Sequence, residues 1–434
     1  TNPMPISGSG TLTKTGSGIV TLSGSNTYTG LTSINAGTLN LGNVNALSGG
    51  GNITFGGGTL QFSVTNTVDY ASRITNSSTA ISLDTNSQNV VFNGAIDASN
   101  TGGLTKSGSG ILTLNGSNAY TGPTNVLGGT LRAGVSPTAF GSNSAVTLSS
   151  TAGSTLDLAG FDNTIGSLSG GGTSGGNVAL GSATLTVGSD NTSTTYAGTI
   201  SGSGGLTKIG TGTLTLTGTE TYTGITTISS GTLQIGNGTT DGSIASSSAI
   251  VNNSSIVFNL LGSQTNSMPI SGSGTLTKSG SGILTLSGNN TYTGLTIISA
   301  GTLSLNSTNA LAGSTGIVFK GGTLQFTANN TVDYSSKIIL STSPITIDTN
   351  SQDVLFANAL NSNNTGGLTK WGSGILTLSG ANAYTGPTTV NNGTLKAGTT
   401  STAFGVNSAV TMANNSGALL DVNSFNNTIG SLSG

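Results

Sequence analysis

The chain contains a near-verbatim copy of itself, displaced by 264 residues. The segment Met4–Lys14 returns as Met268–Lys278, and the segment Asn163–Gly170 returns as Asn427–Gly434. Copying a segment without a change of register makes a structure longer. It is not needed to build an active site, which has to be made only once. Repetition of this kind is typical of folds in which each unit packs only on its neighbours.

Composition narrows the fold to many short strands separated by turns. Of the 434 residues, 5% are charged and 71, about one in six, are Gly. An ordinary globular chain is about 25% charged and about 7% Gly. So low a charge argues against a disordered coil, and 7 prolines are too few for a proline-rich linker. Thr, Val, Ile and Leu favour strands, while Gly, Asn and Ser favour turns.

A shorter motif recurs five times within the chain. Its copies are anchored at Lys14, Lys106, Lys208, Lys278 and Lys370. Apolar residues alternate with Thr, as in Leu112-Thr113-Leu114, and a period of two predicts a strand with one buried and one solvated face. The strands are short and stop at Gly or Asn, so we expect them to wind into a β-solenoid in which each coil bonds to the next.

Three slots of the motif carry specific expectations. The apolar slot that does not vary should be buried, and it is held by Leu22, Leu114, Leu216, Leu286 and Leu378. The slot of Trp371 accepts Thr, Ser and Ile in the other copies, so we expect Trp371 to be exposed in a turn. An all-Gly slot needs positive φ or has no room for a side chain, and its members are Gly18, Gly110, Gly212, Gly282 and Gly374.

The motif resembles the autotransporter-associated β-strand repeat, also called the passenger-associated transport repeat. In the second copy the shared residues are Leu104-Thr105-Lys106, Gly108, Gly110, Leu112-Thr113-Leu114, Gly116, Asn118, Tyr120-Thr121-Gly122 and Gly129-Thr130-Leu131. The resemblance implies a parallel β-helix in large surface and secreted proteins of bacteria. It implies no shared enzymatic activity.

We therefore predict an all-β fold, a right-handed single-stranded parallel β-helix in the form of an elongated rod. One continuous solenoid should cover residues 1–434, with a full repeat unit over 1–264 and a partial second unit over 265–434. With about 20–25 residues per coil and about 4.8 Å between stacked strands, the rod would be roughly 80–100 Å long. Stacked apolar side chains and backbone hydrogen bonds should stabilise it, because the chain has no Cys and no His to crosslink it.

The residue types disfavour several chemical functions. Without His or Cys, neither Ser-His-Asp nor Cys-His catalysis can be assembled. A net charge of −2 offers no basic patch to nucleic acid or anionic lipid, and no apolar run approaches the roughly 18 residues of a membrane span. We predict no enzymatic activity, no cofactor and no metal site.

The few carboxylates are expected to cap turns rather than to act in catalysis or to form a weak cation site. The densest of them are Asp84, Asp97, Asp157, Asp162, Asp348 and Asp353.

The repeated polar residues leave alternatives open. We interpret the five motif lysines as exposed charges that discourage lateral strand pairing, rather than as a basic ladder. Five tyrosines either pack over turns with solvated hydroxyl groups or offer stacking platforms for sugars, and they are Tyr28, Tyr120, Tyr222, Tyr292 and Tyr384. Threonine runs such as Thr215-Leu216-Thr217 are interpreted as strand formers rather than as an ice-binding face.

The function that follows is structural: a stalk, filament or adhesin scaffold outside a bacterial cell, at the cell surface. The alternative is a binding module that presents a repeated glycan- or ice-binding face, with the five tyrosines as ligand-facing residues. Expected partners are further copies of the chain, end to end or as a continuing array, and glycans or other surface components. Nucleic acid and membrane insertion are not expected.

Two further expectations concern the ends of the chain and its response to pH. Both ends fall inside the repeat pattern, and the chain starts at Thr1 rather than Met. We therefore expect a fragment of a longer protein or end-to-end stacking. Without His, stability should vary little between about pH 5 and pH 8.

Overall fold

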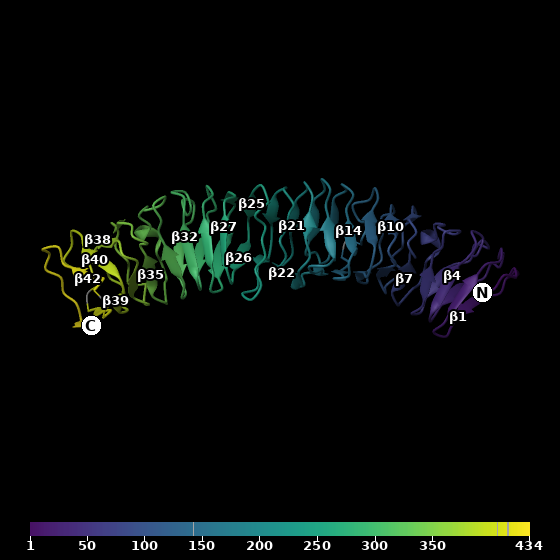
Figure 1. Cartoon of the computed structure of the whole chain (residues 1–434), viewed down its shortest axis with the longest axis horizontal. Helices are drawn as coiled ribbons and strands as arrows, with labels where there is room; N and C mark the ends of the chain where they lie inside the picture. Colours follow the sequence, from purple (N-terminus) through teal and green to yellow (C-terminus); the bar gives the residue numbers. More distant parts are fainter. Residues whose placement is uncertain (142, 406, 415) are drawn as a thin grey trace. The chain divides into compact units, whose positions relative to one another are not determined.

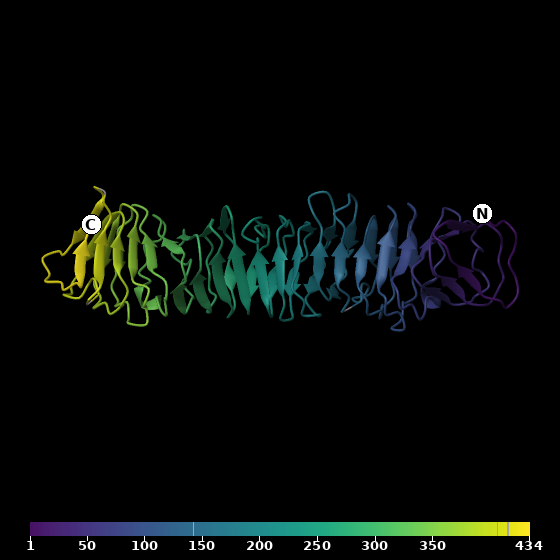
Figure 2. The same cartoon turned by 90° about the horizontal axis from the view of Figure 1, so that it is seen from below.

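The protein is built from short parallel strands stacked in coils. The computed structural model describes residues 1–141, 143–405, 407–414 and 416–434. Its contacts divide the chain into two compact units, unit 1 (Thr1–Gly231) and unit 2 (Thr232–Gly434). Figures 1 and 2 show the strands of each unit as short arrows lying side by side.

The all-β parallel solenoid predicted from the sequence is confirmed, with about 20 turns over the two units. Within the described residues, helix is limited to two single 3-10 turns, η1 (Ala71–Arg73) and η2 (Ser335–Lys337).

In unit 1, each strand pairs in parallel with the equivalent strand of the next coil, and the pairs line up as rows. The longest row contains β2 (Ile19–Leu22), β4 (Thr38–Leu41), β6 (Thr59–Gln61), β7 (Ile81–Asp84), β9 (Leu104–Ser107), β11 (Thr124–Val126), β13 (Val146–Leu148), β16 (Leu168–Gly170), β19 (Thr194–Tyr196) and β22 (Thr213–Leu216). Further rows contain β1 (Leu12–Lys14), β3 (Thr32–Ile34) and β5 (Ile53–Phe55); β8 (Val90–Phe92), β10 (Ile111–Leu114), β12 (Thr130–Ala133), β14 (Thr155–Asp157), β17 (Asn177–Ala179) and β20 (Ile200–Ser201); and β15 (Asn163–Ile165), β18 (Leu185–Val187), β21 (Leu206–Lys208) and β23 (Thr226–Ile228).

Unit 2 repeats this arrangement. Its longest row contains β27 (Ser263–Asn266), β30 (Ile283–Leu286), β32 (Thr302–Leu305), β34 (Thr323–Gln325), β35 (Ile345–Asp348), β37 (Leu368–Trp371), β39 (Thr388–Val390), β41 (Ala409–Met412) and β43 (Ser431–Ser433). Other rows contain β24 (Thr232–Ile235), β26 (Ser255–Asn259), β29 (Thr275–Ser279), β31 (Leu295–Ile298) and β33 (Gly316–Phe319); β36 (Val354–Phe356), β38 (Ile375–Leu378), β40 (Gly393–Ala397) and β42 (Ala418–Asp421); and β25 (Ile250–Asn252) with β28 (Ile270–Ser271).

The strand register fixes the length of a coil. In unit 1 a step of 19 residues joins Ile19 to Thr38, and a step of 26 residues joins Gly170 to Tyr196. Because paired residues keep the same orientation across every step, an inward side chain in one coil lies on an inward side chain in the next. The interior is therefore a set of stacked columns, as expected from the period-two pattern.

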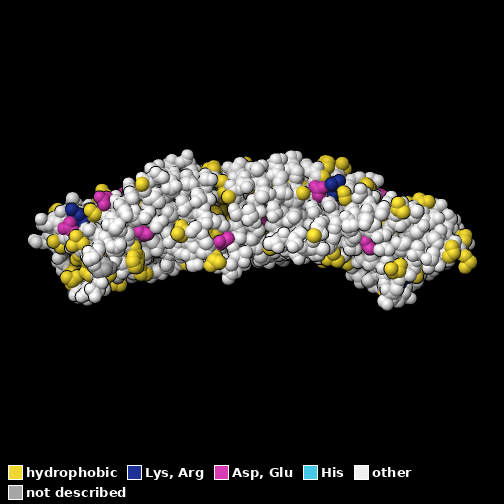
Figure 3. Space-filling view, viewed as in Figure 1, with side chains coloured by type: hydrophobic (Ala, Val, Ile, Leu, Met, Phe, Trp, Pro, Cys, Tyr) yellow, Lys and Arg dark blue, Asp and Glu magenta, His cyan; other side chains and the backbone are white. Residues whose placement is uncertain are grey.

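The core contains the residues that the alternation predicts. The leucines of the unvarying slot are buried in all five motif copies, which confirms that expectation. Trp371 is 47% exposed, also as expected, although it ends strand β37 rather than lying in a turn. On the face shown in Figure 3, hydrophobic side chains are scattered and charged side chains are few.

The all-Gly slot is explained by lack of room rather than by positive φ. A Cβ atom on Gly110 would lie 2.0 Å from the backbone oxygen of Gln88, and one on Gly374 would lie 1.9 Å from that of Gln352. Gly212 and Gly282 are equally confined, whereas Gly18 has open space beside it. The glycine is needed because the neighbouring coil passes directly over this corner.

We predict that Leu114→Ala lowers the free energy of unfolding by about 2–5 kcal/mol, because it leaves a cavity in a stacked column. The matched control is Leu127→Ala, since Leu127 lies in the same unit and is 51% exposed; its effect should stay within about 0.5 kcal/mol. Denaturant titration of the two variants measures both values, and equal effects would contradict the assignment of the core.

Candidate functional site

The five motif lysines are buried, which corrects the interpretation of exposed charges. In β9 the side chains of Leu104 and Lys106 both face the interior, while Thr105 lies between them on the outer side. None of the five lysines exposes more than 5% of its surface. The same alternation that predicts the strand carries the lysine inward, because it stands two residues after a buried leucine.

Each buried ammonium group donates to backbone carbonyls of neighbouring turns. Lys106 Nζ donates to the oxygens of Ser107 at 2.8 Å, Gly108 at 2.8 Å and Gly128 at 2.9 Å. The first two carbonyls follow the lysine in its own coil, and the third belongs to the next coil. All three donors of the ammonium are thereby used, so the lysine joins two consecutive coils at their corner.

The other copies keep this arrangement. Lys14, Lys278 and Lys370 each donate to three equivalent carbonyls at 2.6–3.2 Å. Lys208 donates to the carbonyls of Ile209 and Gly210.

A glycine completes each lysine corner. Gly129 has a φ of 61°, and a Cβ atom on it would lie 2.4 Å from the oxygens of Gly108 and Gly110. A Cβ atom on the equivalent Gly393 would lie 2.8 Å from Lys370 Nζ. Backbone conformation and close packing therefore both require Gly in the Gly-Thr-Leu part of the motif.

Burial destabilises the protonated form of the motif lysines relative to the neutral form. Desolvation lowers the pKa of Lys106, Lys278 and Lys370 to about 8, although one nearby aspartate acts in the opposite direction at each lysine. Between about pH 8 and the ordinary lysine value of 10.5 the unfolded chain therefore holds more protons than the folded chain. Stability contributed by these groups rises with pH across that window.

The five motif tyrosines are also inside the solenoid. Their hydroxyl groups share a hydrogen bond of 2.6–2.8 Å with the threonine four residues later, as between Tyr120 and Thr124. Burial raises the pKa of each phenol. The expectation of solvated hydroxyl groups is wrong. As the structure places Tyr28, Tyr120, Tyr222, Tyr292 and Tyr384, none offers a ring face to a ligand from outside.

A buried asparagine two residues before the tyrosine links three coils. Asn118 Oδ1 accepts from the amide of Ile96 at 2.7 Å, and its Nδ2 donates to the oxygen of Ala139 at 2.7 Å. Asn26, Asn290 and Asn382 make the same pair of bonds. The amide suits this place because it both accepts and donates.

Glu220 occupies the asparagine place in the third copy and cannot reproduce both bonds when ionised. Its Oε2 accepts from the amide of Ile200 at 2.5 Å. Its Oε1 is buried, with no hydrogen-bond partner among the described residues. Burial raises the pKa of Glu220 to about 8, against the Ile200 hydrogen bond, which lowers it. A protonated carboxyl group is favoured there because the neutral form costs less to bury than the charged form.

The aspartates cap backbone amides, as the sequence predicts. Asp84 Oδ1 accepts from the amide of Asn86 at 2.8 Å, and Asp162 accepts from the amide of Thr184 at 2.7 Å. Asp97, Asp157, Asp348 and Asp353 likewise accept from main-chain N–H groups. Across the described ranges, no three His, Cys, Asp or Glu side chains gather closely enough to hold a metal ion.

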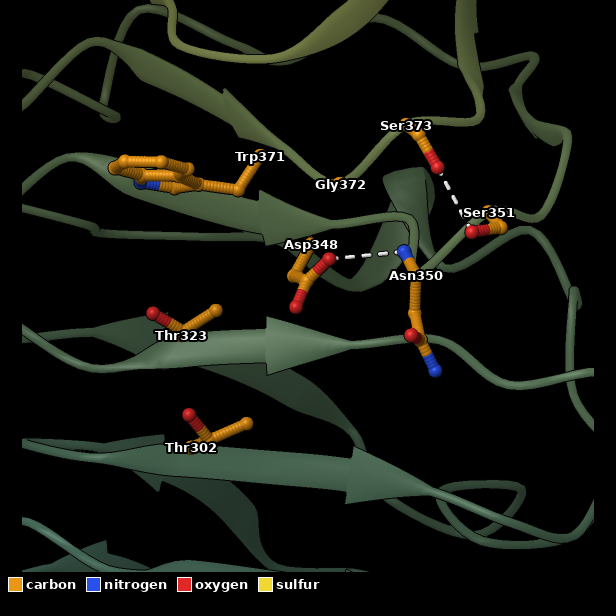
Figure 4. A pocket seen from close by; sticks show the side chains of 8 residues that line it. All are labelled: Thr302, Thr323, Asp348, Asn350, Ser351, Trp371, Gly372 and Ser373. Carbon is orange, nitrogen blue, oxygen red and sulfur yellow. Dashed lines mark hydrogen bonds between the residues drawn. The ribbon is translucent and has the colours of Figure 1, made fainter.

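A surface hollow of about 440 Å³ lies on unit 2 beside Trp371 (Figure 4). It is lined by Thr302, Thr323, Asp348, Asn350, Ser351, Trp371, Gly372 and Ser373. The strand register brings residues of consecutive coils together here. Asp348 on β35 pairs with Gln325 on β34 and with Trp371 on β37. The exposure of Trp371 is predicted from the sequence, whereas the position of Asp348 next to it is not.

Hydrogen bonds hold the floor of this hollow. Asp348 accepts from the Asn350 amide at 2.8 Å and from Gln325 Nε2 at 2.9 Å. The hydroxyl groups of Ser351 and Ser373 lie 2.8 Å apart in the loops that follow β35 and β37. Figure 4 shows this serine pair on one side of Asp348 and the indole of Trp371 on the other.

Six segments of the chain match the family described as Passenger-associated-transport-repeat. The chain carries passenger-associated transport repeats. The matched segments are residues 12–41, 104–133, 206–235, 276–305, 300–326 and 368–397. Five of them coincide with the motif copies found by inspection, and the segment 300–326 is an additional match. The lysine corner, the buried tyrosine and the central strands therefore belong to the repeat itself.

A second comparison concerns a complete protein. Over 254 residues, or 54% of this chain, the sequence is 44% identical to the Adhesin BmaC autotransporter of Brucella suis biovar 1 (strain 1330). The chain spans 7% of the length of that relative. No solved structure matches the chain. The extracellular, cell-surface setting expected from the sequence is confirmed by the repeat family and this relative together.

We predict that Lys278→Met destabilises the protein, because buried carbonyls lose their donor at a cost of about 1–3 kcal/mol for each that stays unpaired. Lys320→Met is the control, since Lys320 is exposed in the same unit and its loss should change stability by less than about 0.5 kcal/mol. Chemical denaturation compares the two variants. If both lysines were equally dispensable, the role of the lysine corner would be refuted.

We predict that Glu220→Asn removes a pH dependence from the protein. The folded chain keeps a proton on Glu220 up to about pH 8, whereas the unfolded chain releases it near the ordinary value of 4.5. Wild-type stability should therefore decrease as pH rises through this window, which replaces the expectation of a flat profile.

The variant should be more stable than wild type at pH 8 by about 1–3 kcal/mol, the cost of a buried unsatisfied group, and the difference should shrink toward pH 5. Melting curves at several pH values measure this difference. Thr219→Asn, at an exposed neighbouring position, is the control. Parallel profiles for wild type and Glu220→Asn would contradict the prediction.

Proposed function

We propose that this chain is a stretch of solenoid in the extracellular passenger of a bacterial surface protein, where it acts as an adhesin scaffold. The observation that carries the proposal is the repeated coil, in which Lys, Asn, Tyr and Gly meet the same structural needs in copy after copy. Such a coil extends a protein without adding a new domain. The name of the relative, an adhesin and autotransporter, supports the same role.

The proposal includes no catalysis. It is supported by the use of the polar groups, since the buried lysines, asparagines and tyrosines are occupied in joining coils and the aspartates cap turns. In the described part of the chain, no helix has the length and apolar character needed to cross a bilayer. A single continuous solenoid over residues 1–434, with its 264-residue unit, and end-to-end contact between copies also belong to the proposal.

The surface location is tested with an epitope inserted after Val64, which is 84% exposed in the turn between Ser63 and Asn66. Exposed loop tips of this kind tolerate insertions. In cells that make the complete natural protein, an antibody should label intact cells, and added protease should remove the label. The control is a cytoplasmic protein with the same epitope. Labelling that requires permeabilised cells would overturn the proposal.

The scaffold role is tested by electron microscopy of the purified natural protein. Elongated particles are expected, and their length should grow with protein concentration if copies join end to end. Compact particles would contradict the scaffold, whereas elongated particles of constant length would contradict only the end-to-end contact.

A further inference from the structure

The hollow beside Trp371 differs from an otherwise identical place in unit 1 by one side chain. Each residue that lines the hollow has a counterpart 264 positions earlier in the chain. The counterparts are Thr38, Thr59, Asp84, Asn86, Ser87, Ser107, Gly108 and Ser109. Ser107 stands where unit 2 has Trp371. This chain has one Trp, and it stands here, about half exposed beside a carboxylate.

The polar frame is the same in both units. Asp84 accepts from Asn86 and Gln61 at 2.8 Å each, just as Asp348 accepts from Asn350 and Gln325. The serine pair also recurs, with Ser87 and Ser109 hydroxyl groups 2.9 Å apart. A frame that holds without the indole does not need Trp371 for its own stability, so the ring is free to serve a ligand.

The chemistry of the hollow favours an uncharged, hydroxyl-rich ligand. The indole supplies a wide apolar face with a polar N–H. Around it, Thr302, Thr323, Asn350 and Ser373 offer neutral donors and acceptors, while Asp348 offers carboxylate oxygens. None of the lining residues is a Lys or Arg, and Lys370 Nζ, which precedes Trp371 in the chain, is buried and donates to the carbonyls of Trp371, Gly372 and Asn392. Within this lining an anionic ligand would therefore meet a carboxylate and no cation.

We propose that this hollow is a binding site for a neutral pyranose of a surface glycan, with the sugar stacked on Trp371. The sugar ring would lie against the indole. The hydroxyl groups of the sugar would donate to Asp348 and form hydrogen bonds with the surrounding hydroxyl and amide groups. A volume of about 440 Å³ falls within the range of small-molecule sites in proteins, roughly 300–1,000 Å³. This binding activity is separate from the scaffold role and does not depend on where the protein is displayed.

The experiment uses the purified chain on an array of neutral, sialylated, sulfated and amino-sugar glycans, followed by calorimetry with the best neutral glycan. Intrinsic fluorescence gives an independent signal in the wild type, because Trp371 is the sole indole. Trp371→Ser converts the hollow into its unit 1 counterpart and should weaken binding at least about tenfold, as expected for a central aromatic anchor. Leu355→Ser is the control, since Leu355 is also 47% exposed in unit 2.

A second experiment tests for gain of function by placing a Trp beside the polar residues around Asp84 in unit 1. The double variant Ser107→Trp/Trp371→Ser should recover binding to the same glycan, and melting curves should show that each variant is folded. The proposal would be overturned by equal binding of wild type and Trp371→Ser. Binding only to anionic or cationic glycans would overturn it as well. So would a double variant that is folded but does not bind the glycan.

Discussion

The backbone hydrogen bond from one coil to the next is the interaction on which the rest of this structure depends. A parallel coil satisfies its strands through its neighbours, but carbonyls at its corners lie outside the strands and need other donors. The motif lysine supplies donors at one corner, and the asparagine supplies both a donor and an acceptor at another. The polar residues that recur in the repeats are therefore structural parts of the buried interior, although their type alone favours the surface.

The period of two accounts for most of what the sequence predicts correctly. It places the leucines of the unvarying slot inside. The same rule, applied without regard to residue type, would also have placed Lys106 and Tyr120 inside, because each follows an inward residue at a distance of two. The sequence interpretation instead makes Lys106 an exposed charge that discourages lateral strand pairing and packs Tyr120 over a turn with a solvated hydroxyl group. A buried ammonium is costly unless it is paired, and the three carbonyls that pair with Lys106 come from backbone corners, which a one-dimensional pattern does not display.

Other features were outside the reach of the sequence for a different reason. Asp348 and Trp371 are 23 positions apart and become direct partners only through the register of β35 and β37. The lack of room at Gly374 likewise depends on how closely Gln352 passes over it. Glu220 and Trp371 are the informative exceptions within the repeats. Glu220 replaces an amide inside a coil and keeps only the bond from the Ile200 amide. Trp371 stands where unit 1 has a serine outside the coil, and the polar frame around Asp348 is kept.

The buried lysines separate the net charge of the protein from the charges that another molecule can touch. Of 10 basic residues, the five motif lysines are enclosed, whereas of 12 acidic residues only Glu220 is. The long-range field still follows the formal total, because an enclosed charge contributes to it. At contact distance, however, a neighbouring cell or chain meets many more carboxylates than cations. The outer wall of this solenoid is thus poorly equipped for ion pairing with acidic partners, and the proposed adhesion through it would depend on hydrogen bonding, apolar stacking or cations that the partner brings.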